Sequence, residues 1–546
     1  MFLKSIHAAA FDLSRYLGYI SISNRQPAIC RSYHGIRRKD DVSFLKTLVI
    51  RSRCLLPITA GLATAQIIAF FFVRHANRVL ADQVQALQTA GWLAIPSGPA
   101  AAALKTFGAA FWGGLFFTLS VGTGLTLATV AFLFLGRRCR GGRRWWLLAG
   151  AVIWTAALIA VNLDGPTLVP TLFVACTPLA TALFAVQLRP DAAGEPSTPR
   201  RWYLPLITLL LLILLWSTQL NRELFTAIRD HLLLSNAAGR QVNDFYYRYT
   251  LFAAQAFKSF EQKTLRTCHL DPDLDPNAAS AWVDLLARYD VLPVPETVPA
   301  DVRLHSHDGQ LRLVSPNGAA VEADQTAFRQ DPRSWLRRFS EAADRYGPFR
   351  RMALMGLLVG FPILLYIMVD GGIGRLAGLI ASADALVWIR SSICLAIGVM
   401  LLIPLLISRV QAVPEDQIGR ALTADSWPRR VAALRRIEDQ RMDIARYSRY
   451  RHLLESPWVV ERYWLARALG SSRHPSTYSD LLRLAQDPHP NVVCQAYYAL
   501  GQRGQRTAAK AIEAQMVQSD HWYTQWYGYR AMRRLGWRQT RSTSGP

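Results

Sequence analysis

The stretch FGAAFWGGLFFTLSVGTGLTLATVAFLFLG, residues 107–136, contains no charged side chain. A helix needs about 20 apolar residues to cross the ~30 Å hydrocarbon core of a bilayer, and this stretch is longer. A charged side chain at the bilayer centre would cost about 2.5–3.5 kcal/mol, so a long charge-free run is informative. Seven spans are predicted on this basis, at residues 55–74, 108–135, 146–162, 167–188, 203–219, 352–370 and 387–408. The chain is therefore predicted to be an integral membrane protein of mainly α fold, with a polytopic helical bundle.

The same stretch is rich in glycine, serine and threonine. Small residues allow membrane helices to approach closely, and hydroxyl groups can form hydrogen bonds across the contact. We expect the second span to be the packing centre of the bundle. A polar permeation path along these hydroxyl groups is the alternative interpretation.

The net charge of +24 is unevenly distributed along the 546 residues. Residues 1–53 carry ten Lys or Arg against three Asp, and the loop GRRCRGGRRWW between the second and third spans carries five Arg. The next loop, NLDGPTLVP, has one Asp and no cation, whereas RPDAAGEPSTPRRW before the fifth span is basic again. Basic loops stay in the cytoplasm, so this alternation predicts a cytoplasmic N-terminus. An organellar transit peptide in residues 1–39 is the alternative for the basic tail. Nucleic acid is not an expected partner, because the arginines adjoin membrane spans.

A small extramembrane domain is predicted between the fifth and sixth spans. Residues 219–350 hold 16 basic and 17 acidic residues, so the segment lacks the charge excess of the other loops. DPNAASAWVDLLARYDVLPV indicates a helix followed by a short strand, and DVRLHSHDGQLRLVSPNG indicates a hairpin that turns at Asp308-Gly309. PRSWLRRFSEAADRY indicates a last helix. An α+β insert on the outer side of the membrane follows, which is the periplasm in a bacterium.

The insert opens with an aromatic segment, NDFYYRYTLFAAQAFKSFEQKTLRTCHL, residues 243–270. Phe245, Tyr249, Phe252 and Phe260 recur at spacings typical of one helix. We interpret the segment as an amphipathic helix that packs in the core of the insert or rests its ringed face on the membrane surface. A platform for a cofactor or quinone is the sharper alternative.

The C-terminal part of the chain is self-similar. The segments ESPWVVERYWLARALGSS (455–472) and QDPHPNVVCQAYYALGQR (486–503) align on a shared Ala-Leu-Gly, and HWYTQWYGYRAMRRLG (521–536) continues the series with Ala531-Met532 in register. DSWPRRVAALRRIEDQ (425–440) is a weaker first copy. A period of about 30 residues made of paired helices predicts an α-solenoid, with small residues where the helices approach closely.

The pattern D-P-x-P-x-V…A-x-x-A-L-G resembles a HEAT repeat of the short, phycobilisome-lyase-like kind. Its residues here are Asp487, Pro488, Pro490, Val492, Ala496, Ala499, Leu500 and Gly501. The resemblance covers the last quarter of the chain, and the upstream copy departs from it at Glu461, where Val is usual. A HEAT resemblance implies a scaffold surface for protein partners and does not imply lyase activity.

Several chemistries lack their usual signatures in the sequence. The seven cysteines include no C-x-x-C pair, and neither a Gly-x4-Gly-Lys-Ser/Thr loop nor an H-E-x-x-H motif occurs. Asp164 and Asp370 are expected at span ends, and Arg390 near the start of the seventh span. His305 and His307, with Asp308 beside them, are interpreted as a hairpin tip in preference to a metal site. We therefore assign no catalytic, cofactor-binding or metal-binding residue.

These observations predict an integral membrane scaffold or accessory subunit that recruits a protein partner through the HEAT-like domain. A small-molecule transporter or membrane enzyme with a regulatory solenoid is the alternative. The expected divisions are a basic tail (1–43), a five-span domain (44–219), the α+β insert (220–350), a two-span hairpin (351–409) and the solenoid (410–546).

The candidate partner-binding residues are arginines of the repeats, which suit an acidic partner or anionic lipid: Arg429, Arg430, Arg435, Arg436, Arg533 and Arg534. Seven crossings from a cytoplasmic N-terminus favour the periplasmic side of a bacterial inner membrane for the solenoid. The cytoplasmic side stays open as an alternative, because long domains follow the positive-inside rule only loosely. The oligomeric state is not predicted.

Overall fold

The computed structural model describes residues 38–138, 143–187, 203–221, 223–410 and 413–541. The chain divides into two compact units, Met1–Leu55 and Leu56–Pro546, and the boundary falls within helix α2. Most of the predicted basic tail at 1–43 lies outside the described residues.

The apolar helices occur in two groups along the chain. The first group comprises α2 (Arg38–Thr89), the short α3 (Gly98–Ala102) and η1 (Ala103–Lys105), α4 (Phe107–Phe117), η2 (Thr118–Gly122), α5 (Thr123–Arg138), α6 (Arg143–Ala160), α7 (Leu168–Gln187) and α8 (Tyr203–Ser217). The second group comprises α14 (Gly347–Met355), η4 (Gly356–Gly360), α15 (Phe361–Ala377) and α16 (Ala383–Val410).

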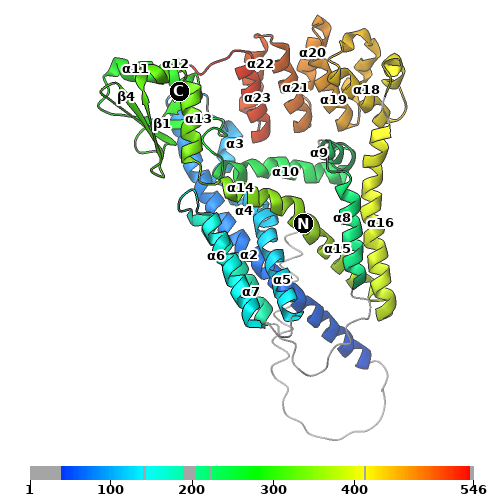
Figure 1. Cartoon of the computed structure of the whole chain (residues 1–546). Helices are drawn as coiled ribbons and strands as arrows, with labels where there is room; N and C mark the ends of the chain where they lie inside the picture. The colour runs from blue at the N-terminus through cyan, green and yellow to red at the C-terminus, as the bar shows by residue number, and fades with distance from the viewer. Residues whose placement is uncertain (1–37, 139–142, 188–202, 222, 411–412, 542–546) are drawn as a thin grey trace. The chain divides into compact units, whose positions relative to one another are not determined.

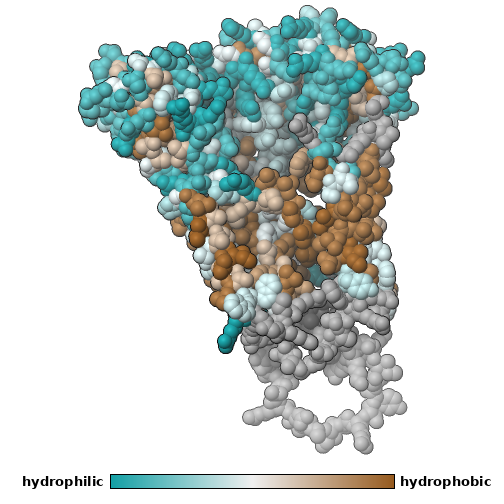
Figure 2. Space-filling model, in the orientation of Figure 1, coloured by the Kyte–Doolittle hydropathy of each residue, from teal (hydrophilic) through white to brown (hydrophobic). Residues whose placement is uncertain are grey.

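Five helices of the described residues are long and apolar enough to cross a membrane: 55–89, 107–137, 168–186, 347–377 and 385–406. The predicted third and fifth spans are shorter apolar helices, at 144–160 and 203–217. The 15 residues of α8 extend over only about 22 Å, which is less than a ~30 Å hydrocarbon core. Figure 2 shows the hydrophobic side chains gathered over α6, α7, α8, α15 and α16, and hydrophilic side chains over the sheet and the C-terminal helices (Figure 1).

Two short π-helical segments, η2 and η4, pack closely against each other in the bundle. A Cβ atom on Gly356 of η4 would lie 2.2 Å from the backbone oxygen of Ser120 in η2. The hydroxyl oxygens of Thr126 and Thr181 lie 2.4 and 2.3 Å from the position of a Cβ on Gly61. Within the second span itself, a Cβ on Gly114 would lie 3.1 Å from the backbone nitrogen of Phe70 in α2, and one on Gly124 would lie 3.4 Å from the Cα of Gly356. Small residues on both sides of these contacts allow the helices to approach closely, which supports the packing-centre interpretation.

The sequence predicted Asp370 at the end of its span, but the structure places it inside helix α15. Helix α15 continues to Ala377, and the Asp370 carboxylate lies 3.4 Å from the Arg390 guanidinium of α16. The opposite charges of the pair offset part of the cost of placing each charged side chain among apolar helices. The segment after residue 370 completes α15 and begins α16.

The insert between α8 and α14 is α+β, as predicted. It contains α9 (Leu224–Ile228), η3 (Arg229–Leu233), α10 (Ala237–Ala256), β1 (Arg266–Leu270), α11 (Pro276–Ala287), β2 (Val291–Pro293), β3 (Val302–His307), β4 (Gln310–Val314), β5 (Ala320–Asp324), α12 (Gln325–Gln330) and α13 (Pro332–Ala343). The sheet order is β2-β1-β3-β4-β5, with β1 parallel to β2 and β3, and the remaining pairs antiparallel. The hairpin turn predicted at Asp308-Gly309 is confirmed, since both residues have positive φ, 46° and 75°.

The aromatic segment 243–270 is not one helix, and this prediction was wrong. Helix α10 ends at Ala256, and Phe260 lies beyond it in the core of the sheet, 5.0 Å from the ring of Phe339. Residues 266–270 form the inner strand β1, which lies between β2 and β3 and is parallel to both. Pairing across long sequence separations overrides the local helical spacing here.

The C-terminal region is helical. Its elements are η5 (Glu415–Gln417), α17 (Ile418–Ala421), α18 (Trp427–Asp439), η6 (Ile444–Arg446), η7 (Ser448–Glu455), α19 (Val459–Leu469), α20 (Pro475–Leu484), α21 (Pro490–Arg503), α22 (Ala508–Gln518) and α23 (Trp522–Arg534). Helices α18, α19, α21 and α23 pack against one another in that order (Figure 1).

The small residues of the repeats lie at close helix contacts, as predicted. A Cβ on Gly470 of α19 would lie 3.0 Å from the Cβ of Ala499 in α21. One repeat later, a Cβ on Gly501 would lie 3.1 Å from the Cα of Ala531 in α23. The Ala-Leu-Gly sequence thus sets the distance between neighbouring repeat helices.

Candidate partner-binding surface

Part of the C-terminal region is already covered by the insert. The indole N–H of Trp464 in α19 donates to Asp230 of η3 at 2.8 Å, and the side chains of Asn243 in α10 and Asn491 in α21 are bonded at 2.9 Å. Trp522, the first residue of α23, packs on Phe252 of α10 with ring centroids 5.2 Å apart. Segments η3 and α10 therefore cover the N-terminal halves of helices α19, α21 and α23.

Two histidines are enclosed in this contact. His489 precedes α21, and its ring lies 3.5 Å from the Asp244 carboxylate of α10. His521 precedes α23, and neither of its ring nitrogens has a hydrogen-bond partner among the described residues. Burial lowers the pKa of both rings, that of His521 to about 4. Burial therefore favours the uncharged form of both imidazoles at the contact between α10 and the repeats.

The predicted aromatic stripe of α10 faces two neighbours. Phe252 is buried against Trp522, whereas Phe245 and Tyr249 approach Trp112 of α4, at 5.3 and 6.4 Å between ring centroids. A small pocket opens beside them, where Arg248 of α10 pairs with Asp520 at 3.2 Å. The stripe thus connects the apolar helices to the C-terminal region and includes only three of the four predicted rings, because Phe260 is elsewhere.

Three of the six predicted partner-binding arginines form ion pairs within the chain. Arg430 pairs with Glu461 at 2.7 Å, Arg435 with Glu223 at 3.2 Å, and Arg533 with Asp290 at 3.2 Å. The other three, Arg429, Arg436 and Arg534, are exposed.

Arg430 belongs to a structural position that recurs in the repeats. Arg430, Arg462 and Gln525 each lie three residues after the start of a repeat helix, and each donates to a backbone carbonyl six residues earlier. Arg430 also bonds the buried Glu461, and Arg462 bonds Asp487 at 2.6 Å. The departure from the HEAT pattern at Glu461 therefore supplies the partner of Arg430, and neither residue is available to an external ligand.

Two of the six predicted arginines, Arg435 and Arg534, belong to a row of arginines and aromatic rings that extends across four helices. The Arg435 guanidinium lies 5.2 Å from the Trp464 ring, and Arg467 lies 5.0 Å from the same ring and 5.8 Å from Tyr498. The Arg534 guanidinium of α23 lies 4.8 Å from the Tyr498 ring. We call this row, together with Arg530 stacked 4.6 Å from Trp526, the arginine–aromatic ladder. Stacking of this kind stabilises a guanidinium and fixes its plane.

Some arginines of the ladder have acidic partners within the chain, and others do not. Arg467 pairs with Glu438 at 2.6 Å, and Arg435 with Glu223. Arg530 and Arg534 are exposed, and neither has an ion pair or hydrogen bond in the part of the chain that the structure describes. The α23 end of the ladder is therefore positively charged and open.

Sequence reasoning identified Arg435 and Arg534 but missed Arg467, Arg530 and the rings. The signal was present, because Arg435, Arg467, Tyr498 and Arg530 follow one another at the repeat interval of about 30 residues. Each lies eight residues after the start of its helix. Aligning the repeats column by column would have revealed a column of basic and aromatic residues.

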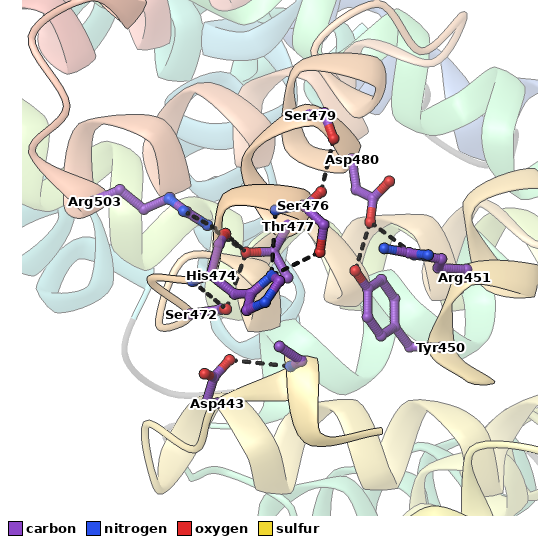
Figure 3. A network of polar contacts seen from close by, with 11 residues as sticks. Asp443, Tyr450, Arg451, Ser472, His474, Ser476, Thr477, Ser479, Asp480 and Arg503 are labelled. Carbon is purple, nitrogen blue, oxygen red and sulfur yellow. Dashed lines mark hydrogen bonds and ion pairs between the residues drawn. The ribbon is translucent and has the colours of Figure 1, made fainter. Parts of the chain in front are cut away.

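A separate polar network joins η7, α20 and α21 (Figure 3). Arg503 of α21 donates to Thr477 of α20 at 2.8 Å, and Tyr450 bonds Asp480. His474 caps α20 by accepting from the backbone N–H of Ser476, whose hydroxyl lies 2.8 Å from the same ring nitrogen. These contacts connect turns to helices, so we interpret the network as structural.

The two hairpin histidines lie beside different aspartates. His305 lies 3.5 Å from Asp271, whereas His307 lies 3.1 Å from Asp308. Within the described ranges no group of three or more His, Cys, Asp or Glu side chains is arranged to hold a metal ion.

Residues 451–533 match the family described as HEAT repeats. This match supports a C-terminal HEAT-repeat domain, the part of the chain that carries most of the ladder. HEAT repeats commonly mediate contacts between proteins, using the extended surface that stacked repeats create. Comparison with curated proteins and with solved structures gave no match.

Proposed function

We propose that the chain is an integral membrane scaffold whose HEAT-repeat domain, an α-solenoid, recruits a protein partner. The observation that carries the proposal is the ladder, which places an arginine or a tyrosine in the same column of successive repeats and is exposed at its α23 end. Side chains that recur at the repeat interval suit an extended partner better than a small molecule. The domain divisions expected from sequence, 1–43, 44–219, 220–350, 351–409 and 410–546, are part of this proposal.

The proposed topology has seven crossings, a cytoplasmic N-terminus, and both the insert and the solenoid on the periplasmic side of a bacterial inner membrane. Contacts between insert and repeats support a common side: the Tyr529 hydroxyl donates to Asp290, and Arg533 bonds the backbone oxygen of Arg288. The apolar helices α15 and α16, which lie between the two in sequence, pack together as a hairpin. The arginine-rich loop 137–144 supports a cytoplasmic position for the opposite ends of the helices.

A membrane enzyme or transporter is the second candidate, with the HEAT repeats as a regulatory domain. The Asp370–Arg390 pair between α15 and α16 favours it, since charged residues within membrane helices often mark substrate or proton pathways.

Site-specific photo-crosslinking in the native host tests the scaffold proposal. A photoreactive amino acid replaces Tyr498 in the ladder or, as a matched control, Arg429 on α18. A discrete protein adduct from position 498 that is absent at position 429 is expected. Adducts of equal yield and pattern at both positions, or at neither, would contradict a partner-binding role for the ladder.

A further inference from the structure

The α23 end of the ladder combines fixed geometry with unused hydrogen-bonding capacity. Arg530 stacks on Trp526 and Arg534 on Tyr498, at 4.6 and 4.8 Å. A guanidinium stacked over a ring face keeps its N–H groups in its own plane, parallel to the ring, where their edges stay accessible to an acceptor. These two arginines are therefore pre-oriented donors for an acceptor that comes from outside the chain.

The charge around them is one-sided. Residues 503–541 contain two acidic residues, Glu513 and Asp520, and the latter already pairs with Arg248. The basic residues of the same stretch are Arg503, Arg506, Lys510, Arg530, Arg533, Arg534, Arg538 and Arg541. The potential at this end of the repeats is positive, and it favours an anionic group.

We propose that Arg530 and Arg534 bind an acidic segment of the partner protein, with carboxylates at alternate positions of an extended chain. The inference rests on the proposed scaffold function and names the chemistry of its partner. Side chains four residues apart on a helix have Cβ atoms about 5–6 Å apart. Alternate side chains of an extended strand lie on one face about 6.6 Å apart, so an acid-x-acid sequence can reach both arginines.

The geometry favours a protein segment over a lipid surface. Trp522 at the start of α23 packs on α10, and Phe245 and Tyr249 of α10 approach α4, one of the apolar helices. Arg530 and Arg534 follow Trp522 by eight and twelve residues, or about 12 and 18 Å along the helix. Helix α10 and the first half of α23 thus separate the two arginines from the apolar helices.

Peptide binding to the full-length protein in phosphatidylcholine nanodiscs tests the proposal. The probe is a fluorescein-labelled peptide of alternating Glu and Ser, and its Gln-Ser counterpart is the uncharged control. The R530Q/R534Q variant is compared with R429Q/R436Q, which removes two exposed arginines that stack on no ring among the described residues. We expect the Glu-Ser peptide to bind the wild type and R429Q/R436Q equally, and R530Q/R534Q at least tenfold more weakly.

Equal weakening in both double variants would overturn the proposal, because it would indicate attraction to net charge alone. Binding of the wild type to phosphatidylserine vesicles through Arg530 and Arg534, without peptide binding, would overturn it in favour of lipid. R530K/R534K keeps the charge and is used if R530Q/R534Q does not fold. Lysine cannot form the paired, planar contact, so we expect it to weaken binding as well.

Crosslinking from position 498 in the R530Q/R534Q background separates this inference from the scaffold function. Loss of the wild-type adduct supports the acidic-segment proposal. An undiminished adduct would leave the scaffold function intact and overturn the role of the two arginines. Absence of an adduct in the wild type would instead contradict the scaffold function itself.

Discussion

At the scale of single residues, the repeats distinguish arginines that the sequence presents alike. Arg429 and Arg430 are adjacent, yet Arg429 is exposed and Arg430 pairs with Glu461, which is fully buried. A rotation of about 100° per residue along a helix separates the two roles. The sequence predicted a basic surface but not this separation, because the partner of Arg430 lies in the next repeat.

Replacement of Arg430 by Met leaves the Glu461 carboxylate buried without its cation. Removing one partner of a buried pair costs about 3–5 kcal/mol, so we expect a loss of that order in the free energy of unfolding. Chemical denaturation of detergent-solubilised protein, followed by tryptophan fluorescence, measures it.

Arg429→Met is the matched control and should stay within about 0.5 kcal/mol of wild type. The R430M/E461Q double variant should recover part of the loss. Equal effects of R429M and R430M would contradict the assigned role of the buried pair.

His521 makes docking of α10 on the repeats dependent on pH. Arg248 and Asp244 of α10, together with Asp520 and His489, face its ring. Because its pKa is about 4 in the folded protein, below the unfolded value near 6.5, its contribution is full above pH ~6.5. The contribution is lost as pH falls towards 4, up to about 3 kcal/mol in total.

Hydrogen exchange of residues 521–530 between pH 7.5 and 4.5 measures this dependence. After correction for the intrinsic pH dependence of exchange, protection should fall with pH in the wild type and fall less in His521→Gln. An identical pH profile for both proteins would show that another group controls the contact.

At the scale of elements, local patterns succeeded where a helix or hairpin closes on near neighbours. The Asp308-Gly309 turn, α11 and α13 were all predictable from spacing and turn chemistry. The aromatic segment failed because β1 is held by two strands that follow only after helix α11, beginning with Arg266 opposite Val291. The π-helical segments η2 and η4 had no signal beyond the small residues that allow them to meet.

Gly356→Ala should disrupt the contact between η2 and η4. The added Cβ would lie 2.2 Å from the Ser120 oxygen, where a real contact requires about 3 Å or more, and backbone cannot move aside cheaply. We expect a cost of about 1–3 kcal/mol or more, visible as a lower midpoint of thermal unfolding in detergent.

Gly371→Ala on α15 provides the control, since nothing lies within 4 Å of its added Cβ. Its midpoint should equal or exceed that of wild type, because alanine favours helix by about 1 kcal/mol over glycine. Similar midpoints for G356A and wild type would contradict close packing of the two π-helical segments.

At the scale of the whole molecule, the sequence indicated apolar helices, an α+β insert and helical repeats, but not their contacts. Tyr529 and Asp290 are 239 residues apart, and Trp464 and Asp230 are 234 apart. The periodicity of a sequence does not predict contacts between residues so far apart. These contacts determine which face of the repeats stays open. The structure therefore favours the ladder as the candidate surface over the six arginines predicted from the sequence.

The central claim is that the HEAT repeats lie on the opposite side of a membrane from the arginine-rich loop 137–144. Paired fusions after Pro546 test it in a bacterial host, with alkaline phosphatase active only outside the cytoplasm and a fluorescent protein folded only inside it. We expect phosphatase activity after Pro546 and fluorescence from the same reporters placed within the loop after Arg138. Fluorescence after Pro546 would contradict the account, and it would place the ladder and its partner in the cytoplasm.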